Sequence, residues 1–182
     1  MARGNGCRKG RCPMAIAAIK DHTLVKFSTP TKYNGVLFRS RLEATYAEWL
    51  DDIGLVWAYE PEGYKLSGGL AYLPDFWLPD QKAWLECKGV MLPDDDAKIV
   101  SLAVESKCDV FVGSLIRGGD MRIGAVDMYN EFGHEVVYTT MIAAKCGKCE
   151  RVWLMQEWGS WACRCCGYYA GNAGFDELES VG

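Results

Sequence analysis

Asp75, Glu86 and Lys88 are the residues of this chain whose types and spacing are best suited to chemistry. They lie in two apolar segments, residues 72–78 and 83–88, which predict two β-strands. The four residues between the segments, Pro-Asp-Gln-Lys, are typical of a tight turn. The pattern therefore predicts a β-hairpin that carries all three charged side chains.

The register of this hairpin decides which side chains meet. If the turn is centred between Asp80 and Gln81, Asp75 lies directly opposite Glu86. Opposed side chains of an antiparallel pair have Cβ atoms about 4.5–5.5 Å apart, and like charges there repel each other. Lys88 follows two residues after Glu86 and projects from the same face of the strand. A divalent cation would remove the repulsion, so this register predicts a metal site.

The alternative for these residues is a surface hairpin with one ion pair and a turn aspartate, because short motifs recur by chance. Leu73, Phe76, Leu78 and Leu85 make both segments apolar enough to be buried. Charged groups on a buried strand need a partner or a metal. The apolar neighbours therefore favour the metal site.

A third acid, Glu43, lies in the first turn of a predicted amphipathic helix. The helix opens at residues 39–43, apolar residues recur at helical spacing, and Gly54 is its expected stop. Ser40 and Glu43 also have the spacing of a capping box, in which Ser40 caps the first turn and Glu43 reaches back. Both interpretations stay open, because a first-turn glutamate could cap the helix and also contact a metal through water.

Glu43 on a helix, Asp75 in Pro-Asp, and Glu86 and Lys88 in Glu-x-Lys resemble the PD-(D/E)xK, or restriction-endonuclease-like, nuclease superfamily. The resemblance covers residues 33–89 and is similar in order and spacing to small phage-encoded members, including junction-resolving endonucleases. It implies an α/β fold with a restriction-endonuclease-like core, which is a mixed sheet flanked by helices. It also implies metal-dependent hydrolysis of DNA phosphodiester bonds.

The resemblance assigns a role to each residue of the site. Asp75 and Glu86 would hold Mg²⁺ or Mn²⁺, with the Cys87 carbonyl as a third ligand, since Mg²⁺ takes oxygen ligands and keeps several waters. Lys88 would orient or deprotonate the attacking water, or neutralise charge on the phosphate. Glu43 would assist through a water or a second metal. No small-molecule cofactor is expected.

A second metal site is predicted by two Cys-x-x-Cys elements, Cys146 with Cys149 and Cys163 with Cys166. Thirteen residues separate the two elements, close to the spacing of Cys₄ zinc sites. Two such turns can direct four thiolates at one tetrahedral Zn²⁺. Residues 151–156 and 158–161 between them could pair as a short hairpin, so we expect a small C-terminal zinc ribbon. Its aromatic side chains could form a small core or stack on DNA bases.

Other cysteines leave alternatives open. Cys165 lies inside the second Cys-x-x-Cys element, and Cys7 and Cys12 together with the C-terminal cysteines faintly resemble iron–sulfur nucleases. Disulfides are a further alternative, but the nine cysteines are an odd number and no convincing secretory signal is present. No apolar run reaches the ~18 residues of a membrane span. We therefore expect no membrane association and an intracellular protein. The resemblance to phage-encoded nucleases implies the cytoplasm of a phage-infected bacterial host.

Charge is distributed unevenly along the chain. The net charge is −4, yet residues 1–41 carry nine Lys or Arg and one acid, and the remainder carries eleven basic and twenty-three acidic residues. A basic segment that leads into the proposed site predicts salt-dependent contacts with DNA phosphates. The candidate nucleic-acid contacts are Arg8, Lys9, Arg11, Arg39 and Arg41.

The rest of the pattern completes the core and divides the chain. A helix is expected after Pro93 with Asp96 as its cap, followed by strands at 109–113 and 135–140. We expect a basic N-terminal arm and lead-in segment at 1–28, a nuclease core at 29–140, a Cys₄ zinc ribbon at 141–170 and a flexible tail at 171–182.

The expected function is a metal-dependent DNA endonuclease that selects junctions, flaps or replication intermediates in phage DNA metabolism. A homodimer would suit a two-fold substrate such as a four-way junction. The alternatives are a sequence-specific or nicking endonuclease, a nuclease acting on RNA, and a non-catalytic zinc-ribbon protein that binds DNA or docks a partner.

Overall fold

A six-stranded mixed sheet forms the centre of the computed structural model, which describes residues 29–115, 121–130, 133–137, 140–157, 159, 161–169, 171 and 173–178. The strand order is β10-β9-β8-β7-β6-β3. The strands are β3 (Ala58–Tyr59), β6 (Phe76–Leu78), β7 (Ala83–Lys88), β8 (Asp109–Leu115), β9 (Met121–Asn130) and β10 (Gly133–Val137). β7 and β8 are parallel, and the other neighbours are antiparallel. The predicted α/β class with a mixed sheet is confirmed.

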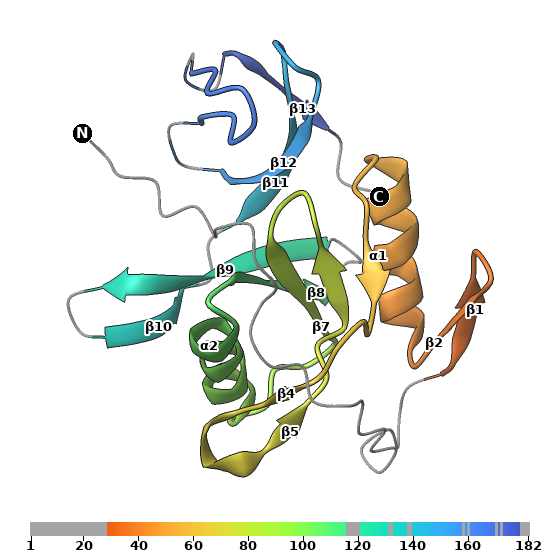
Figure 1. The fold of residues 1–182 in the computed structure, drawn as a ribbon. Helices are drawn as coiled ribbons and strands as arrows, with labels where there is room; N and C mark the ends of the chain where they lie inside the picture. Colours follow the sequence, from red (N-terminus) through yellow and green to blue (C-terminus); the bar gives the residue numbers. More distant parts are fainter. Residues whose placement is uncertain are drawn as a thin grey trace.

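Two helices cover opposite faces of this sheet (Figure 1). α1 (Arg41–Asp52) and α2 (Asp95–Ser106) lie on either side of strands β7 and β8. Leu85 of β7 belongs to the hydrophobic cluster of α1, and its neighbour Trp84 belongs to the cluster of α2. Successive strand residues point to opposite faces, so β7 is buried from both sides.

The close packing of α1 depends on a glycine in β8. A Cβ atom on Gly113 would lie 2.4 Å from Cζ of Tyr46, so a larger residue would clash with the buried tyrosine ring. The Tyr46 hydroxyl also donates to the Ser114 carbonyl over 3.4 Å. The helix that carries Glu43 is therefore held directly against the central strands.

The predicted β-α-β crossover is present as β7, α2 and the parallel strand β8. The predicted cap Asp96 is wrong: Asp94 is the N-cap residue and Asp96 lies in the first turn. Asp95 instead accepts a hydrogen bond from the Leu92 backbone amide over 2.8 Å. The long strand β9 was not predicted, and the strand expected at 135–140 is β10, which begins at Gly133 and ends at Val137.

Pro74 divides the first predicted strand of the hairpin. Tyr72 belongs to β5 (Ala71–Tyr72), which pairs with β4 (Tyr64–Lys65), and β6 begins at Phe76. Proline has no N–H for a ladder hydrogen bond, which explains the break. Between β4 and β5 lies a short 3₁₀ helix, Ser67–Gly69. A separate hairpin of β1 (Thr31–Tyr33) and β2 (Val36–Phe38) precedes α1.

The C-terminal module is a three-stranded sheet of β11 (Met141–Cys146), β12 (Val152–Gln156) and β13 (Phe175–Leu178), in the order β12-β11-β13. Where a hairpin between 151–156 and 158–161 was predicted, the described residues of β12 pair with β11 instead, and residues 158 and 160 lie outside the described part of the chain. The predicted flexible tail is also wrong over β13, which pairs with the other edge of β11. Phe175 anchors this strand: it is buried and contacts the rings of Trp161 and Tyr168.

The C-terminal module shares its hydrophobic core with the central sheet. Met141, Ala143 and Leu154 belong to the same buried cluster as Leu50 of α1. The turn of the β6–β7 hairpin points toward this module (Figure 1). There the buried side-chain amide of Gln81 donates to the Val152 carbonyl over 3.0 Å and accepts from the Leu154 amide over 3.2 Å.

Within the described residues, no helix is both long enough and apolar enough to cross a membrane.

Candidate active site and metal centre

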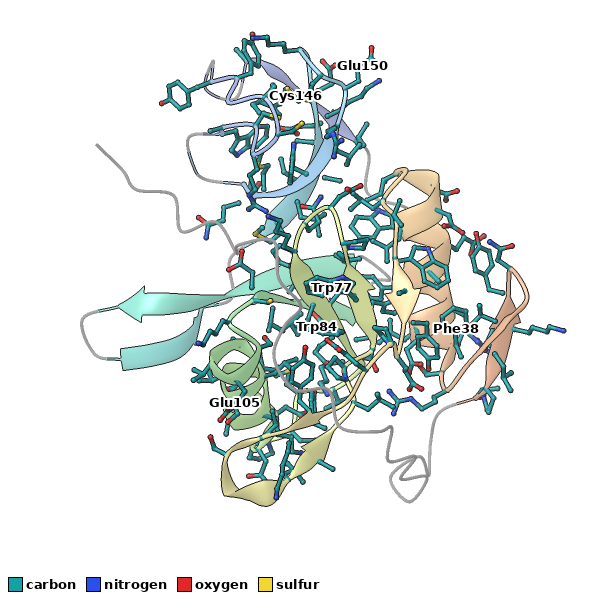
Figure 2. The ribbon with its side chains drawn as sticks, viewed as in Figure 1. Phe38, Trp77, Trp84, Glu105, Cys146 and Glu150 are labelled. Carbon is teal, nitrogen blue, oxygen red and sulfur yellow. The ribbon has the colours of Figure 1, made fainter. Side chains whose placement is uncertain are left out.

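The β6–β7 hairpin has the predicted register. Phe76 pairs with Leu85, Trp77 with Trp84, and Leu78 with Ala83, and the two tryptophans lie beside each other in Figure 2, with ring centroids 4.8 Å apart.

One further step in this register brings Asp75 opposite Glu86. The Cys87 backbone amide donates to Asp75 Oδ2 over 2.8 Å, which ties the Pro-Asp segment to the Glu-x-Lys strand. Asp75 is 5% exposed and Glu86 is 1% exposed. Two buried carboxylates therefore lie at the carboxyl end of β7.

Glu43 forms the predicted cap and lies near Asp75. The Ser40 hydroxyl accepts from the Glu43 backbone amide over 3.1 Å and donates to Glu43 Oε1 over 2.7 Å. Glu43 Oε2 accepts from the Arg39 backbone amide over 3.1 Å and from the Tyr59 hydroxyl over 2.5 Å. Three donors therefore bind the Glu43 carboxylate, and the Glu43 backbone amide is capped by Ser40. These bonds account for a buried carboxylate at the start of a helix.

Arg39 lies among the acids. Its Nη2 is 2.6 Å from Asp75 Oδ1, its Nε is 2.6 Å from Glu60 Oε1, and the same Nε is 4.0 Å from Glu43 Oε2. Arg41, the other predicted DNA contact in this region, is exposed on α1. The remaining predicted contacts, Arg8, Lys9 and Arg11, lie outside the described residues.

Lys88 lies between two other acids, Glu86 and Asp95. Its Nζ is 3.5 Å from Glu86 Oε2 and 3.9 Å from Asp95 Oδ1. The Tyr72 hydroxyl donates to Glu86 Oε2 over 2.7 Å. The structure therefore brings together all four predicted catalytic residues, with Lys88 beside Glu86 and Glu43 beside the Arg39–Asp75 pair.

Burial shifts the titration of the paired carboxylates. It raises the pKa of Asp75 well above its usual range, and the negative charges of Glu86 and Glu43 add to this effect. Burial also raises the pKa of Glu86, although Lys88 and Tyr72 oppose the shift. The charged forms of both carboxylates are therefore destabilised and would gain from a nearby cation.

For Lys88, neighbouring charges determine the direction of the pKa shift and outweigh the effect of burial. Burial on its own lowers the pKa of the Lys88 ammonium, but the charges of Glu86, Asp75 and Asp95 outweigh it, and the pKa is raised. Lys88 is thus a fixed positive charge at neutral pH.

The donor set fits a hard divalent cation. Glu86 Oε1 is buried and has no hydrogen-bond partner among the described residues. A buried oxygen without a partner is costly, and carboxylate oxygens are the ligands that Mg²⁺ and Mn²⁺ prefer. The side chain of Cys87 packs against the α1 cluster, which leaves its backbone as the part that could serve a metal.

Four residues of the site, Tyr59, Glu60, Tyr72 and Asp95, had no role predicted from the sequence. Tyr59 and Glu60 come from a segment outside the hairpin, and nothing in their spacing relates them to Asp75 or Glu86. Tyr72 opens the segment predicted as the first strand of the hairpin, but no role in the site was predicted for it. Asp95 could have been found, because it belongs to the Asp-Asp-Asp run that starts the helix after Lys88. Glu60 also has a left-handed backbone, with φ of +44°, which is uncommon for a residue other than glycine.

The four predicted zinc ligands lie together in the C-terminal module. The sulfur atoms of Cys146, Cys149, Cys163 and Cys166 all lie within 4.8 Å of one another. The Cys146–Cys166 separation is 3.9 Å and the Cys149–Cys163 separation is 3.4 Å. Zn–S bonds of about 2.3 Å place tetrahedral sulfurs about 3.8 Å apart, so this Cys₄ site could bind a structural metal such as zinc.

The remaining cysteines and aromatics of the module take other positions. Cys165 is exposed and is not among the four grouped sulfurs, while Cys7 and Cys12 lie outside the described residues. Trp153 and Trp161 are buried in the small core of the module. Figure 2 shows Cys146 among sulfur atoms in this module, away from Trp77 and Trp84 of the hairpin.

Comparisons of the chain with models of protein families, with curated proteins and with solved structures found no match.

Proposed function

We propose that this chain is a divalent-metal-dependent DNA endonuclease with a restriction-endonuclease-like core, selective for junctions, flaps or replication intermediates. The observation that carries the proposal is the buried pair Asp75 and Glu86 beside the ammonium of Lys88. Arg39 and Lys88 each pair with one of these carboxylates, but Glu86 Oε1 is buried without a hydrogen-bond partner among the described residues, and a divalent ion would satisfy it. Metal-dependent catalysis would explain why the two buried carboxylates and the Lys88 ammonium lie together.

The order of the elements supports the superfamily assignment. Glu43 lies in the first turn of α1, Asp75 directly precedes β6, and Glu86 and Lys88 lie in β7, with α2 crossing over to the parallel strand β8. This is the order of helix, hairpin and crossover that the resemblance implies. A phage origin and DNA as the partner belong to the same proposal, as does a homodimer for a two-fold substrate.

Asp75 and Glu86 would hold Mg²⁺ or Mn²⁺, together with the Cys87 carbonyl. When bound, such an ion acts as a Lewis acid toward phosphoryl oxygen and makes its bound water more acidic. The Tyr72 hydroxyl positions Glu86 through its Oε2 atom, and the Cys87 amide positions Asp75 through its Oδ2 atom. Glu43 supports the site from α1 through the Arg39 and Tyr59 contacts.

Lys88 neutralises charge on the scissile phosphate or orients the attacking water. Its raised pKa keeps it protonated, which favours these two roles over proton abstraction. Asp95 holds the ammonium from the side of α2.

The Cys₄ site is assigned to structural zinc, because four thiolates close the coordination sphere and leave no position for substrate. Zinc would fix the turns at Cys146–Cys149 and Cys163–Cys166. Because the C-terminal module shares its core with α1, the metal would also support the nuclease core.

One observation favours a second candidate, a non-catalytic DNA-binding protein. Arg39 already forms ion pairs with Asp75 and Glu60, and such a cluster could be purely structural. The two candidates differ in whether a divalent ion binds and whether DNA is cut.

A plasmid-nicking assay with Mg²⁺ or EDTA tests the reaction on wild type, Lys88→Met and the control Lys82→Met. Lys82 is exposed in the hairpin turn, so its variant removes the same charge away from the site. The proposal expects Mg²⁺-dependent nicking that Lys88→Met lowers by about 100-fold or more, while Lys82→Met stays near wild type. If wild type binds the plasmid in a gel-shift experiment but does not nick it in Mg²⁺, the second candidate would be favoured.

A further inference from the structure

Arg39 is the most exposed member of the charged group around Asp75. Its side chain is 36% exposed, compared with 20% for Glu60 and 7% for Asp75. Its backbone is nevertheless fixed, because the Arg39 amide donates to Glu43 Oε2 and to the Tyr59 hydroxyl. The guanidinium is thus attached to a rigid point at the start of α1 and has access to solvent.

The charges of the group do not balance. Glu43, Glu60, Asp75 and Glu86 supply four negative charges when ionised, whereas Arg39 and Lys88 supply two positive charges. The difference of two matches the charge of one divalent ion. Asp95 Oδ1 lies 3.9 Å from Lys88 Nζ and 3.7 Å from Lys98 Nζ, so including Asp95 together with Lys98 adds one charge of each sign and leaves the difference at two.

A divalent ion on Asp75 would lie close to the Arg39 guanidinium, since Arg39 Nη2 is 2.6 Å from Asp75 Oδ1. The two cations repel each other strongly at such distances in a partly buried site. The guanidinium is also the group best shaped to bind a phosphate through two parallel hydrogen bonds.

Glu60 gives the displaced guanidinium a second anchor. Its carboxylate is 2.6 Å from Arg39 Nε, on a different nitrogen from the one that contacts Asp75. Its backbone amide donates to the Asp75 carbonyl over 2.8 Å, and its left-handed backbone, with φ of +44°, holds it at this point. Arg39 can therefore leave Asp75 without leaving the site.

We propose that Arg39 occupies the cation position beside Asp75 in the metal-free protein and becomes a ligand of the substrate phosphate when the divalent ion binds. Glu60 acts as the positioning residue that keeps the guanidinium at the site during this exchange. The inference rests on the proposed function, because it requires a divalent ion on Asp75 and a phosphate substrate.

The first test measures the affinity of the zinc-loaded full chain for Mn²⁺ in the absence of DNA. The electron paramagnetic resonance signal of free Mn²⁺ reports how much of the ion remains unbound. Arg39→Ala should bind Mn²⁺ about fivefold or more tightly than wild type, because a competing charge has been removed. The control Arg41→Ala removes the same charge from an exposed position on α1 and should stay within about twofold. Equal affinities for Arg39→Ala and Arg41→Ala would overturn the inference.

The second test compares DNA affinity in Ca²⁺, which takes oxygen ligands, and in EDTA. Arg39→Ala should weaken DNA binding by about tenfold in Ca²⁺ and hardly at all in EDTA, where Asp75 and Glu60 hold the guanidinium. Arg41→Ala should weaken binding equally in both conditions. An equal loss for Arg39→Ala in Ca²⁺ and EDTA would show a permanent phosphate contact and overturn the exchange.

A third variant, Arg39→Lys, separates loss of the guanidinium from misfolding of the site. Arg39→Lys keeps the positive charge among the acids but cannot bind phosphate through a guanidinium fork, so it should lose most of the Ca²⁺-dependent gain in DNA affinity. A full gain in Arg39→Lys would contradict the assigned phosphate contact. If wild type and Glu86→Gln bind Mn²⁺ equally weakly, the proposed metal site itself is wrong, and the exchange falls with it.

Discussion

The backbone amide of Cys87 donates a hydrogen bond to the side chain of Asp75 over 2.8 Å. Cys87 lies between Glu86 and Lys88 in β7, so this one bond sets the position of Asp75 relative to both. An asparagine could keep an acceptor for the Cys87 amide while losing the charge.

Asp75→Asn should therefore fold but lose the rise in melting temperature that Mg²⁺ or Mn²⁺ gives the wild type. Cleavage should fall by at least about 100-fold, since loss of a metal ligand removes several kcal/mol of stabilisation. Differential scanning fluorimetry with and without the ion checks the first result. The control is Asp80→Asn, which changes a half-exposed acid of the hairpin turn and should respond to the ion as wild type does.

The effect of the divalent ion on stability should depend on pH. The pKa values of Asp75 and Glu86 are raised in the folded state, so protonation of these carboxyl groups stabilises the metal-free folded protein at pH values below their unfolded-state pKa values. This stabilisation is lost as the pH rises through the folded-state pKa values. The ion replaces the protons, and its stabilisation should therefore grow from about pH 4 upward.

Melting temperatures of the zinc-loaded chain with Mg²⁺ and without added Mg²⁺ at a series of pH values measure this growth. In Glu86→Gln, which lacks one of the two titrating ligands, the Mg²⁺-induced shift should be small at every pH. A wild-type shift that is constant across the series would mean that the ion binds elsewhere.

Gln81 should contribute to stability through its contacts with the C-terminal module. Gln81→Ala leaves the Val152 carbonyl and the Leu154 amide without their side-chain partners, at a cost of about 1–3 kcal/mol. Urea denaturation should show a lower midpoint for Gln81→Ala than for wild type. Lys82→Ala, an exposed change in the same turn, should leave the midpoint nearly unchanged, and equal midpoints for the two variants would contradict the assigned role.

Cys146→Ser should release zinc and destabilise more than the C-terminal module. Cys146 ends β11, and the same strand supplies Met141 and Ala143 to the cluster of α1. Metal analysis should find less than one zinc per chain in Cys146→Ser, and hydrogen exchange should show weaker protection in both β11 and α1. Cys165→Ser changes an exposed thiol and should keep its zinc. Full zinc in Cys146→Ser would contradict the ligand assignment.

Local patterns were sufficient to predict the hairpin register and the start of α1. The turn at Asp80 and Gln81 fixes the pairing of its own strands, and Ser40 and Glu43 satisfy donors within one helical turn. These features depend on residues close in sequence, where the period of side-chain orientation is a reliable guide.

Features that depend on distant partners were missed. The strand β13 forms because it pairs with the free edge of β11 and because Phe175 packs against the ring of Trp161. Glu60 reaches the site because β3, which it follows directly, pairs with β6. Tyr72 is close to Asp75 in sequence, but it contacts Glu86 from β5, which pairs with β4 and not with the hairpin. No spacing along the chain encodes such contacts, since they are set by tertiary packing.

Cleavage of labelled single-stranded, duplex, flap and four-way-junction DNA, each with Mg²⁺, Mn²⁺ or EDTA, shows whether the chain is a metal-dependent nuclease. Wild type is compared with Glu86→Gln, which removes the charge of the proposed ligand, and with Glu62→Gln, which makes the same change at an acid paired with Tyr64. We expect metal-dependent cutting by wild type and Glu62→Gln, strongest on a branched substrate, and none by Glu86→Gln. Cutting by Glu86→Gln at the wild-type rate would contradict this prediction.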